Sequence, residues 1–203
     1  VVILTRSLES ASAKFDAHVE AHVWDPMQGP PPAQALSGVG GVVNLAGENL
    51  SAKRWSDEQK KRLLDSRVVT TRNLVKGLEN LPAGQVRSFV QVSAIGRYPA
   101  NQPQALDESA PAGTGFLAEV CRQWEEAAAP AANLASKYTL LRLGVVLGRE
   151  GGALAKLMPI FKLGAGGPVG DGKQMMSWIH VEDVVGLIGH ALEGDELAGT
   201  VNA

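Results

Sequence analysis

Short apolar runs alternate with longer stretches of helical period along this chain of 203 residues. The runs are rich in β-branched residues and end at glycine or polar residues, as strands do. The longer stretches carry apolar residues at every third or fourth position, as amphipathic helices do. This alternation predicts an α/β fold, with a mostly parallel sheet covered by helices. The expected strands are 1–4, 42–45, 88–92, 139–143 and 200–202, and the expected helices are 56–78, 116–129, 153–163 and 181–192.

Capping and breaking residues support the boundaries of the first long helix. Ser56 and Gln59 form a capping-box pattern at its start, and Pro82 blocks its continuation. Segments rich in glycine and proline predict loops between the elements. The later loops are longer than a plain connection needs, which is typical of loops that hold substrate. The loops are 28–41, 97–115 and 163–174.

Composition narrows the class of partner. Lys and Arg total 19 against 21 Asp and Glu, which gives a net charge of −2. No excess of charge favours nucleic acid or an anionic membrane, so we expect neither as a partner. The single cysteine, Cys121, has no partner for an internal disulfide, which indicates a reducing compartment. With no apolar run of transmembrane length and no signal-peptide pattern, we expect a cytoplasmic protein that binds a small molecule.

The first two strands end in residues that suit a ligand. In an open parallel sheet, ligands bind beyond the carboxyl ends of the strands. The first strand closes with Thr5, Arg6 and Ser7, where a guanidinium between two hydroxyls can contact a phosphate. A solvated turn explains these residues as well. After the second strand, Ala46 and Gly47 would let a flat ligand approach the backbone, although a plain exit from a strand explains them equally.

The next two strands also end in residues that suit chemistry. Ser93 closes the third strand and Tyr98 follows it, so the two hydroxyls could polarise a carbonyl; a serine that only caps the strand is the alternative. Arg142 lies among apolar residues of the fourth strand, shortly before Gly144. A buried arginine needs a partner. That partner is either structural, such as a carboxylate or strand-end carbonyl groups, or a ligand phosphate.

The histidines and the cysteine fit structural roles. His180 precedes a helix, with Asp183 three residues later, so the pair is either an acid/base couple or a helix-capping arrangement. His18 and His22 have a helical spacing without a third ligand nearby, and we expect no metal site. Cys121 lies on an expected helix and fits a small core residue.

Several segments, taken together and in this order, resemble one known family. The segments are "VVILTRS", "VVNLAGENL", "RWSDEQKKRLLDSRVVTTRNLV", "VSAIGRY", "FLAEVCRQWEEAA", "LRLGVVLGREGGAL" and "WIHVEDVV". The chain resembles the atypical extended short-chain dehydrogenase/reductases (SDR) named epimerase family proteins, which are NAD-dependent epimerase/dehydratase-like. The resemblance covers nearly all of the sequence, and "NLAGENL" followed by "RW" is specific to this branch.

The resemblance implies a Rossmann-like, doubly wound parallel sheet with helices on both faces that binds NADP(H). Arg6 and its neighbours would form the 2′-phosphate site, where an acidic residue would have favoured NAD. Residues 1–150 would form the NADP(H)-binding domain, and residues 151–203 part of the substrate side with a return to the sheet. The resemblance places at the cofactor Thr5, Arg6, Ser7, Leu45, Ala46, Gly47, Ser93, Ala94, Arg142 and Gly144, and on the substrate side Trp178 and His180.

The chain departs from the wider family in its catalytic residues. The family uses a Ser or Thr with a Tyr-x-x-x-Lys pair, in which the lysine lowers the pKa of the tyrosine. Here Ala94 matches the position of the catalytic hydroxyl, and the helix "FLAEVCRQWEE" contains neither tyrosine nor lysine. Ser93 and Tyr98 are the remaining catalytic candidates.

The second departure concerns the ends of the chain. Family members open with a strand and a Gly-x-x-Gly-x-x-Gly turn that binds the pyrophosphate, whereas this chain starts at the second strand and ends before the rest of the substrate lobe. We therefore expect a fragment that lacks the first, central strand of the order 3-2-1-4-5-6. In that case 1–4 and 42–45 form no native-like ladder, and either a gap or a rearranged pairing results.

Two classes of function remain open. The leading hypothesis is that the parent protein is an NADP(H)-dependent oxidoreductase or epimerase-like enzyme that acts on an unidentified small molecule. The alternative is a catalytically impaired dinucleotide-binding module that senses redox state or serves as a scaffold. Because the phosphate-binding turn is missing, we expect the fragment alone to be inactive. The sequence gives no indication of the oligomeric state.

Overall fold

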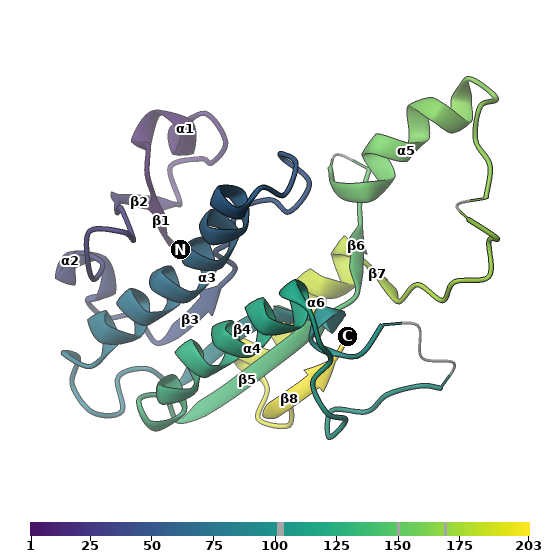
Figure 1. Ribbon diagram of the computed structural model, residues 1–203. Coiled ribbons are helices and arrows are strands. Elements are labelled where there is room, and N and C mark those ends of the chain that lie inside the picture. Colours follow the sequence, from purple (N-terminus) through teal and green to yellow (C-terminus); the bar gives the residue numbers. More distant parts are fainter. Residues whose placement is uncertain (101–103, 150, 169) are drawn as a thin grey trace.

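A four-stranded parallel sheet forms the centre of the computed structural model, which describes residues 1–100, 104–149, 151–168 and 170–203. Its strands are β3 (Gly41–Asn44), β4 (Ser88–Ala94), β5 (Lys137–Leu143) and β8 (Gly199–Asn202), in the spatial order β3-β4-β5-β8 (Figure 1). Because all the pairs are parallel, the carboxyl ends of these strands share one edge of the sheet. The strands expected at 42–45, 88–92, 139–143 and 200–202 are confirmed within one or two residues.

Helices cover both faces of this sheet. The helices α3 (Asp57–Leu78) and α4 (Phe116–Ala128) lie on one face, and α6 (Val181–Glu193) lies on the other (Figure 1). Successive side chains of a strand point to opposite faces, so Phe89 and Val90 belong to different cores. The core under α3 contains Leu36, Val42, Leu74, Val75, Leu78, Val86, Phe89 and Ala131, and the core under α6 contains Val90, Leu141, Leu143, Val184 and Ala191. The fold is therefore Rossmann-like, as the sequence predicts.

The first strand belongs to a separate sheet. It is β1 (Val2–Thr5), and it pairs in parallel with β2 (Glu20–Val23), which the sequence pattern did not reveal. The helix α1 (Leu8–Ser12) connects the two, and α2 (Ala33–Leu36) follows within the expected loop. No ladder joins β1 to β3 in the described residues, which confirms the expected separation of these strands.

A third small sheet stands beside the main one. The strands β6 (Val145–Leu147) and β7 (Trp178–His180) pair in parallel, and α5 (Gly152–Lys162) projects from them (Figure 1). Neither strand was expected. Each strand has only three residues, which is too short for a clear pattern. In addition, β6 follows β5 after a single glycine, so the sequence shows one apolar run where the structure has β5 and β6.

The start of α3 shows half of the expected capping box. The Ser56 hydroxyl accepts a hydrogen bond from the Gln59 amide at 3.2 Å, as an N-cap does. The Gln59 side chain donates to Glu48 Oε1 at 2.9 Å instead of returning to the cap. This contact ties the loop after β3 to the first turn of α3.

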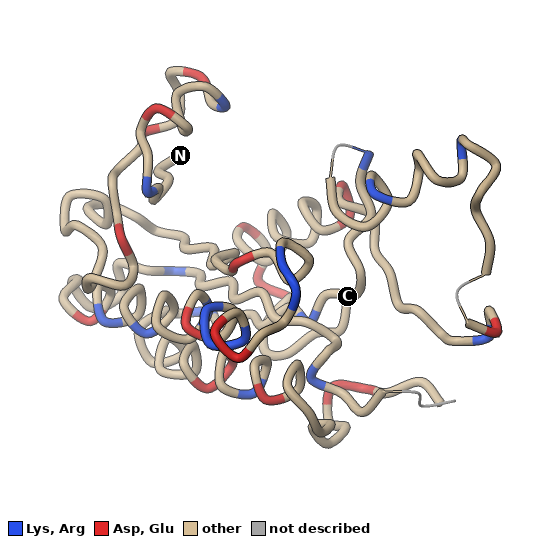
Figure 2. The backbone as a smooth tube through the Cα atoms, turned by 45° about the horizontal axis from the view of Figure 1, so that its top comes forward, with Lys and Arg blue, Asp and Glu red and all other residues tan. Residues whose placement is uncertain are grey.

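Charged residues of both signs are interspersed along the chain (Figure 2). Within the described ranges, no helix combines the length and hydropathy needed to cross a membrane. The same residues contain no group of three or more His, Cys, Asp or Glu side chains placed to hold a metal ion.

Candidate functional site

Strand register brings three polar side chains into one row at the carboxyl edge of the main sheet. Ser93 on β4 is the register partner of Arg142 on β5, and Arg142 is the partner of Asn202 on β8. Ser93 and Arg142 are buried, at 2% and 5% exposure. The row is therefore built into the sheet below the surface that a ligand would meet.

Glu125 of α4 is the partner that Arg142 requires. Its carboxylate accepts from Arg142 Nε at 3.0 Å and from Nη2 at 2.9 Å, a two-pronged ion pair between nearly buried side chains. Burial disfavours the charged form of Arg142, but the hydrogen bonds that it donates to Glu125 and Tyr98 outweigh burial and raise the arginine pKa. In this structure the partner of Arg142 is therefore a carboxylate of the protein.

Glu125 also joins the neighbouring elements of the site. It accepts from the Ser93 hydroxyl at 2.7 Å, and Arg97 Nε lies 3.3 Å from its other oxygen. The Cys121 thiol is buried nearby, and burial, followed by the negative charge of Glu125, raises its pKa. Cys121 is thus a buried thiol in its neutral form, as expected for a core residue.

Tyr98 lies above the row of polar residues. Its hydroxyl accepts from Arg142 Nη1 at 2.7 Å and donates to Asn202 Oδ1 at 2.7 Å. The Asn202 side chain in turn donates to the Leu106 carbonyl at 3.1 Å, which fixes the loop over the sheet edge. Of the two catalytic candidates, Tyr98 is half-buried and Ser93 is buried and engaged by Glu125.

A second polar cluster holds the end of β3. Asn44 is 2% exposed and donates to Thr71 Oγ1 and to Gln91 Oε1, each at 2.8 Å, and its own oxygen accepts from the Ala46 amide at 3.2 Å. The Trp124 indole also donates to Thr71, at 3.0 Å. Asn44 therefore shapes the turn after β3, because it binds buried polar groups on α3 and β4 and the amide of Ala46 in the turn itself.

The small residues after β3 and β5 accommodate protein groups. A Cβ atom on Gly47 would lie 2.9 Å from the Arg67 guanidinium carbon, and one on Gly144 would lie 2.9 Å from the backbone of Ser177. Close packing against backbone therefore requires Gly144, whereas Gly47 leaves room for the Arg67 side chain. In the same turn, Leu45 is 61% exposed and offers an apolar surface at the sheet edge.

At the end of β1, Thr5 and Ser7 make hydrogen bonds within the protein, whereas Arg6 is exposed. Thr5 Oγ1 donates to the Ser7 carbonyl at 3.0 Å, and the Ser7 hydroxyl accepts from the Ser10 amide at 3.2 Å as the N-cap of α1. Arg6 lies near enough to Glu48 to contribute to the lowered pKa of that carboxylate, after the Gln59 hydrogen bond, Arg62 and Lys53.

An open cavity of about 910 Å³ lies beside Tyr98 and the row of polar residues. Its lining includes residues of the turn after β4, the first residues of α4, the segment before β7 and the end of β8. These residues include Trp55, Ile95, Tyr98, Leu106, Phe116, Leu117, Met175, Met176 and Asn202. The cavity thus brings together distant parts of the chain at the carboxyl edge of the sheet.

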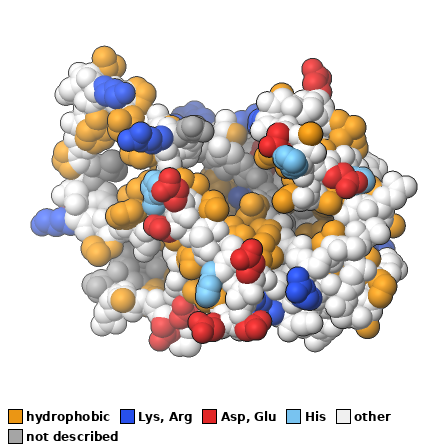
Figure 3. Space-filling model, turned by 180° about the vertical axis from the view of Figure 1, so that it is seen from behind, with side chains coloured by type: hydrophobic (Ala, Val, Ile, Leu, Met, Phe, Trp, Pro, Cys, Tyr) orange, Lys and Arg blue, Asp and Glu red, His pale blue; other side chains and the backbone are white. Residues whose placement is uncertain are grey.

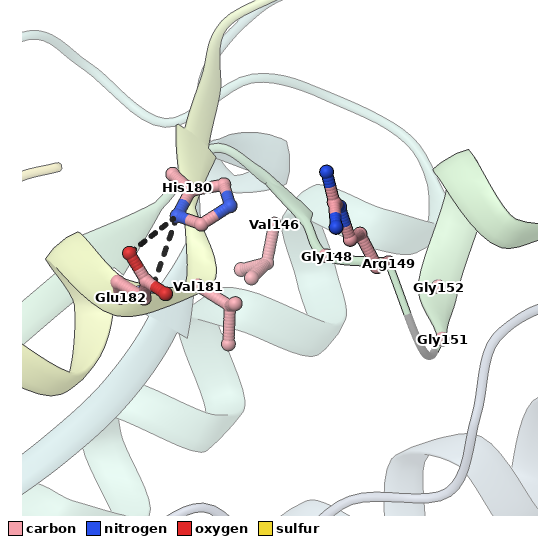
Figure 4. A pocket seen from close by; sticks show the side chains of 8 residues that line it. All are labelled: Val146, Gly148, Arg149, Gly151, Gly152, His180, Val181 and Glu182. Carbon is pink, nitrogen blue, oxygen red and sulfur yellow. Dashed lines mark hydrogen bonds and ion pairs between the residues drawn. The ribbon is translucent and has the colours of Figure 1, made fainter.

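A further pocket of about 750 Å³ surrounds His180 (Figure 4). His180 Nδ1 accepts from the Glu182 amide at 3.3 Å, so the residue is the N-cap of α6. Arg149 stands on the other side of this pocket from His180, beyond Val146 (Figure 4). The helix-capping interpretation of His180 is therefore confirmed. Trp178 is 60% exposed at the start of β7.

The face behind the sheet is hollowed near its middle, and hydrophobic side chains gather around the hollow (Figure 3). The helix α6 covers this side, and two of its residues, Val181 and Val185, are 41% and 66% exposed. Apolar surface is thus left open beside the sheet.

Sequence reasoning missed Glu125 and Asn202. A signal for Glu125 was present, because it stands one position after Trp124 and four after Cys121, on the apolar side of α4. A carboxylate on an apolar helix face requires a buried partner, and Arg142 was the buried cation without one.

Comparisons with known proteins agree with this architecture. The family described as "NAD dependent epimerase/dehydratase family" matches residues 1–203. The Arabidopsis thaliana protein named "Epimerase family protein SDR39U1 homolog, chloroplastic" is 41% identical over 98% of this chain, which spans 57% of that protein.

Two solved structures extend the comparison. The crystal structure of human epimerase family protein SDR39U1 (isoform2) with NADPH is 32% identical, with a TM-score of 0.80 over 98% of this chain and 64% of that one. The nucleoside-diphosphate sugar epimerase from Corynebacterium glutamicum is 32% identical, with a TM-score of 0.76 over 91% of this chain and 40% of that one. The chain therefore belongs to the NAD dependent epimerase/dehydratase family, within the extended short-chain dehydrogenase/reductases.

Proposed function

We propose that this chain carries much of the NADP(H) site of an oxidoreductase or epimerase-like enzyme that acts on a small molecule. The observation that carries the proposal is the human relative, which superposes on 98% of this chain and was crystallised with NADPH. The chain spans less than two thirds of that protein, so the activity is proposed for the whole enzyme.

The exposed groups at the carboxyl edge fit a dinucleotide. Arg6 would bind the 2′-phosphate, Leu45 and the turn to Gly47 would contact the flat adenine side, and Ala94 would lie near the nicotinamide. When bound, NADP(H) supplies or accepts hydride. The chain's own residues would orient it, because the turn after β4 and the cavity beside Tyr98 both lie at the carboxyl edge of the main sheet.

Tyr98 is the better candidate for moving a proton. It lines the cavity, and the Arg142 guanidinium that donates to its hydroxyl is placed to stabilise negative charge on that oxygen during transfer. The Ser93 hydroxyl is buried and donates to Glu125, so we assign it a positioning role. Arg142 and Gly144 likewise support the site without contacting the cofactor, Arg142 through Tyr98 and Glu125 and Gly144 through its packing against Ser177.

Cofactor choice tests the proposal. In Arg6→Ala of the full-length parent we expect the Kd for NADPH to rise about tenfold or more, with little change for NADH, because a charge-assisted contact to the 2′-phosphate is lost. Arg72→Ala is the matched control, since Arg72 is an exposed arginine on α3 away from the site. Equal losses for both nucleotides in Arg6→Ala would remove Arg6 from this role. Absence of NADPH binding to the wild type would refute the proposal.

A second candidate function is a catalytically impaired dinucleotide sensor or scaffold. The absence of tyrosine and lysine from α4, together with the engaged Ser93, favours it. The measurement is NADPH oxidation by the full-length parent protein with a panel of neutral aldehydes and ketones. Turnover that falls in Tyr98→Phe supports the enzyme, whereas NADPH binding without any turnover supports the sensor. For either function we propose a reducing, cytoplasmic setting, which the buried free thiol of Cys121 suits.

A further inference from the structure

The cavity beside Tyr98 indicates which class of substrate the proposed enzyme accepts, and this inference rests on the proposed function. Among the described residues that line the cavity, none is Asp, Glu, Lys, Arg or His. Its volume of about 910 Å³ is within the usual range for small-molecule sites, roughly 300–1,000 Å³. The lining is therefore large enough for a small molecule and carries no charge to pair with an ionised one.

One wall of the cavity is aromatic. The rings of Trp55 and Phe116 meet edge to face, with centroids 5.4 Å apart at 67°. Trp55 Nε1 already donates to the Leu50 carbonyl at 2.8 Å, so the indole offers a ligand only its apolar surface. Lys60 Nζ lies 5.9 Å from the Phe116 ring centroid but is outside the lining and forms an ion pair with Asp57. This wall favours a flat, apolar group.

The polar part of the lining includes the Tyr98 hydroxyl and the neutral side chains of Gln104, Thr114, Ser177 and Asn202. Tyr98 Oη accepts from Arg142 and donates to Asn202, which leaves one acceptor position on the oxygen for a ligand O–H group. The charge of Arg142 is compensated by Glu125 behind the lining. A neutral alcohol can donate to Tyr98 without losing the hydration of a charge, whereas a phosphate or carboxylate would enter without a cation to pair with.

From these observations we propose that the site binds a neutral, mainly apolar alcohol. The proposal distinguishes this chain from the Corynebacterium neighbour, which is named for nucleoside-diphosphate sugars. The diphosphate of such a sugar carries negative charge that the lining of this cavity does not match.

A matched pair of ligands tests the proposal by isothermal titration calorimetry on the full chain. The neutral probe is 1-(2-naphthyl)ethanol, and its charged counterpart is 6-(1-hydroxyethyl)-2-naphthoate. We expect the neutral alcohol to bind at least about tenfold more tightly, because the carboxylate is desolvated without a partner. Equal affinities, tighter binding of the naphthoate, or binding of UDP-glucose more tightly than the neutral alcohol would overturn it.

Substitutions at one exposed lining residue locate the binding. Met176 is 59% exposed and Met158, on α5 outside the lining, is 43% exposed, so neither is required for folding. We expect Met176→Lys to lower the affinity for the alcohol and to raise the affinity for the naphthoate, each about threefold to tenfold. Met158→Lys should change neither affinity. Equal effects of the two substitutions would place the ligand elsewhere and overturn the proposal.

The two proposals fail separately. NADPH binding is followed by its own fluorescence without the alcohol, and the alcohol is titrated without NADPH. If NADPH binds and the neutral alcohol does not, the substrate class is wrong and the proposed function stands. If the alcohol binds in the cavity and NADPH does not bind, the cavity's preference for a neutral alcohol stands and the proposed function is wrong.

Discussion

The buried ion pair between Arg142 and Glu125 gives the sharpest prediction for stability. In Glu125→Leu, Arg142 loses its two carboxylate contacts, at 2.9 and 3.0 Å, and the Ser93 hydroxyl loses its acceptor at 2.7 Å. The Arg142 side chain is 6% exposed, so water does not replace the carboxylate freely. Removal of one partner of such a pair costs about 3–5 kcal/mol in the free energy of unfolding.

Conservative and double substitutions separate charge from packing. Glu125→Gln keeps an acceptor for the arginine but loses the charge, and we expect it to lower the free energy of unfolding by about 1.5–3 kcal/mol. In the double variant Glu125→Leu/Arg142→Met both charges are absent, so the loss should be smaller than the sum of the single losses by at least about 1 kcal/mol. Glu126→Leu is the matched control, because Glu126 is the next residue of α4 and its ion pair with Arg122 is exposed.

Urea denaturation followed by circular dichroism measures these changes. We expect a large loss for Glu125→Leu and no measurable loss for Glu126→Leu. A loss below about 1 kcal/mol in Glu125→Leu, or simple additivity in the double variant, would refute the argument that the pair is coupled and buried.

Two further predictions concern a glycine and a surface carboxylate. Gly144→Ala should lower the free energy of unfolding by about 1–3 kcal/mol, because its Cβ would lie 2.9 Å from neighbouring backbone. Gly186→Ala, in an open position of α6, should raise it by about 0.5–1 kcal/mol, and equal effects in urea titrations would contradict the packing argument. Hydrogen bonds from Arg122 and Gln123 lower the Glu119 pKa from 4.5 to about 2, so the stability that this carboxylate contributes is full above pH 4.5 and is lost as pH falls through about 2. In Arg122→Met an NMR titration should show the Glu119 pKa closer to 4.5, and an unchanged value would contradict this cause.

The elements that the sequence predicts well are those with strong local signals. The helix α3 has a capping serine, a long apolar stripe and a proline beyond its end, and its bounds are nearly those expected. The strand β2 was missed because Glu20 and His22 interrupt its apolar pattern, and its pairing with β1 defines it. Strand pairing between distant segments has no local signal of this kind.

The polar row of the site was only partly predictable. The sequence indicates that Arg142 needs a partner, but that partner lies 17 positions earlier, on a different element. Similarly, Gly47 and Gly144 mark positions where something approaches the backbone closely, and only the structure identifies Arg67 and Ser177 as the neighbours. A glycine in a sequence can therefore indicate a close contact, but it does not indicate which group makes that contact.

Hydrogen–deuterium exchange with and without saturating NADPH tests most directly whether the cofactor lies across the carboxyl ends of the strands. We predict slower exchange of backbone amides in 5–7, 45–47 and 93–97 when NADPH is bound, because these segments end β1, β3 and β4. Segment 80–85, at the opposite edge of the sheet before β4, should not change. Protection confined to 80–85, or no protection at the three strand ends at saturation, would contradict the account.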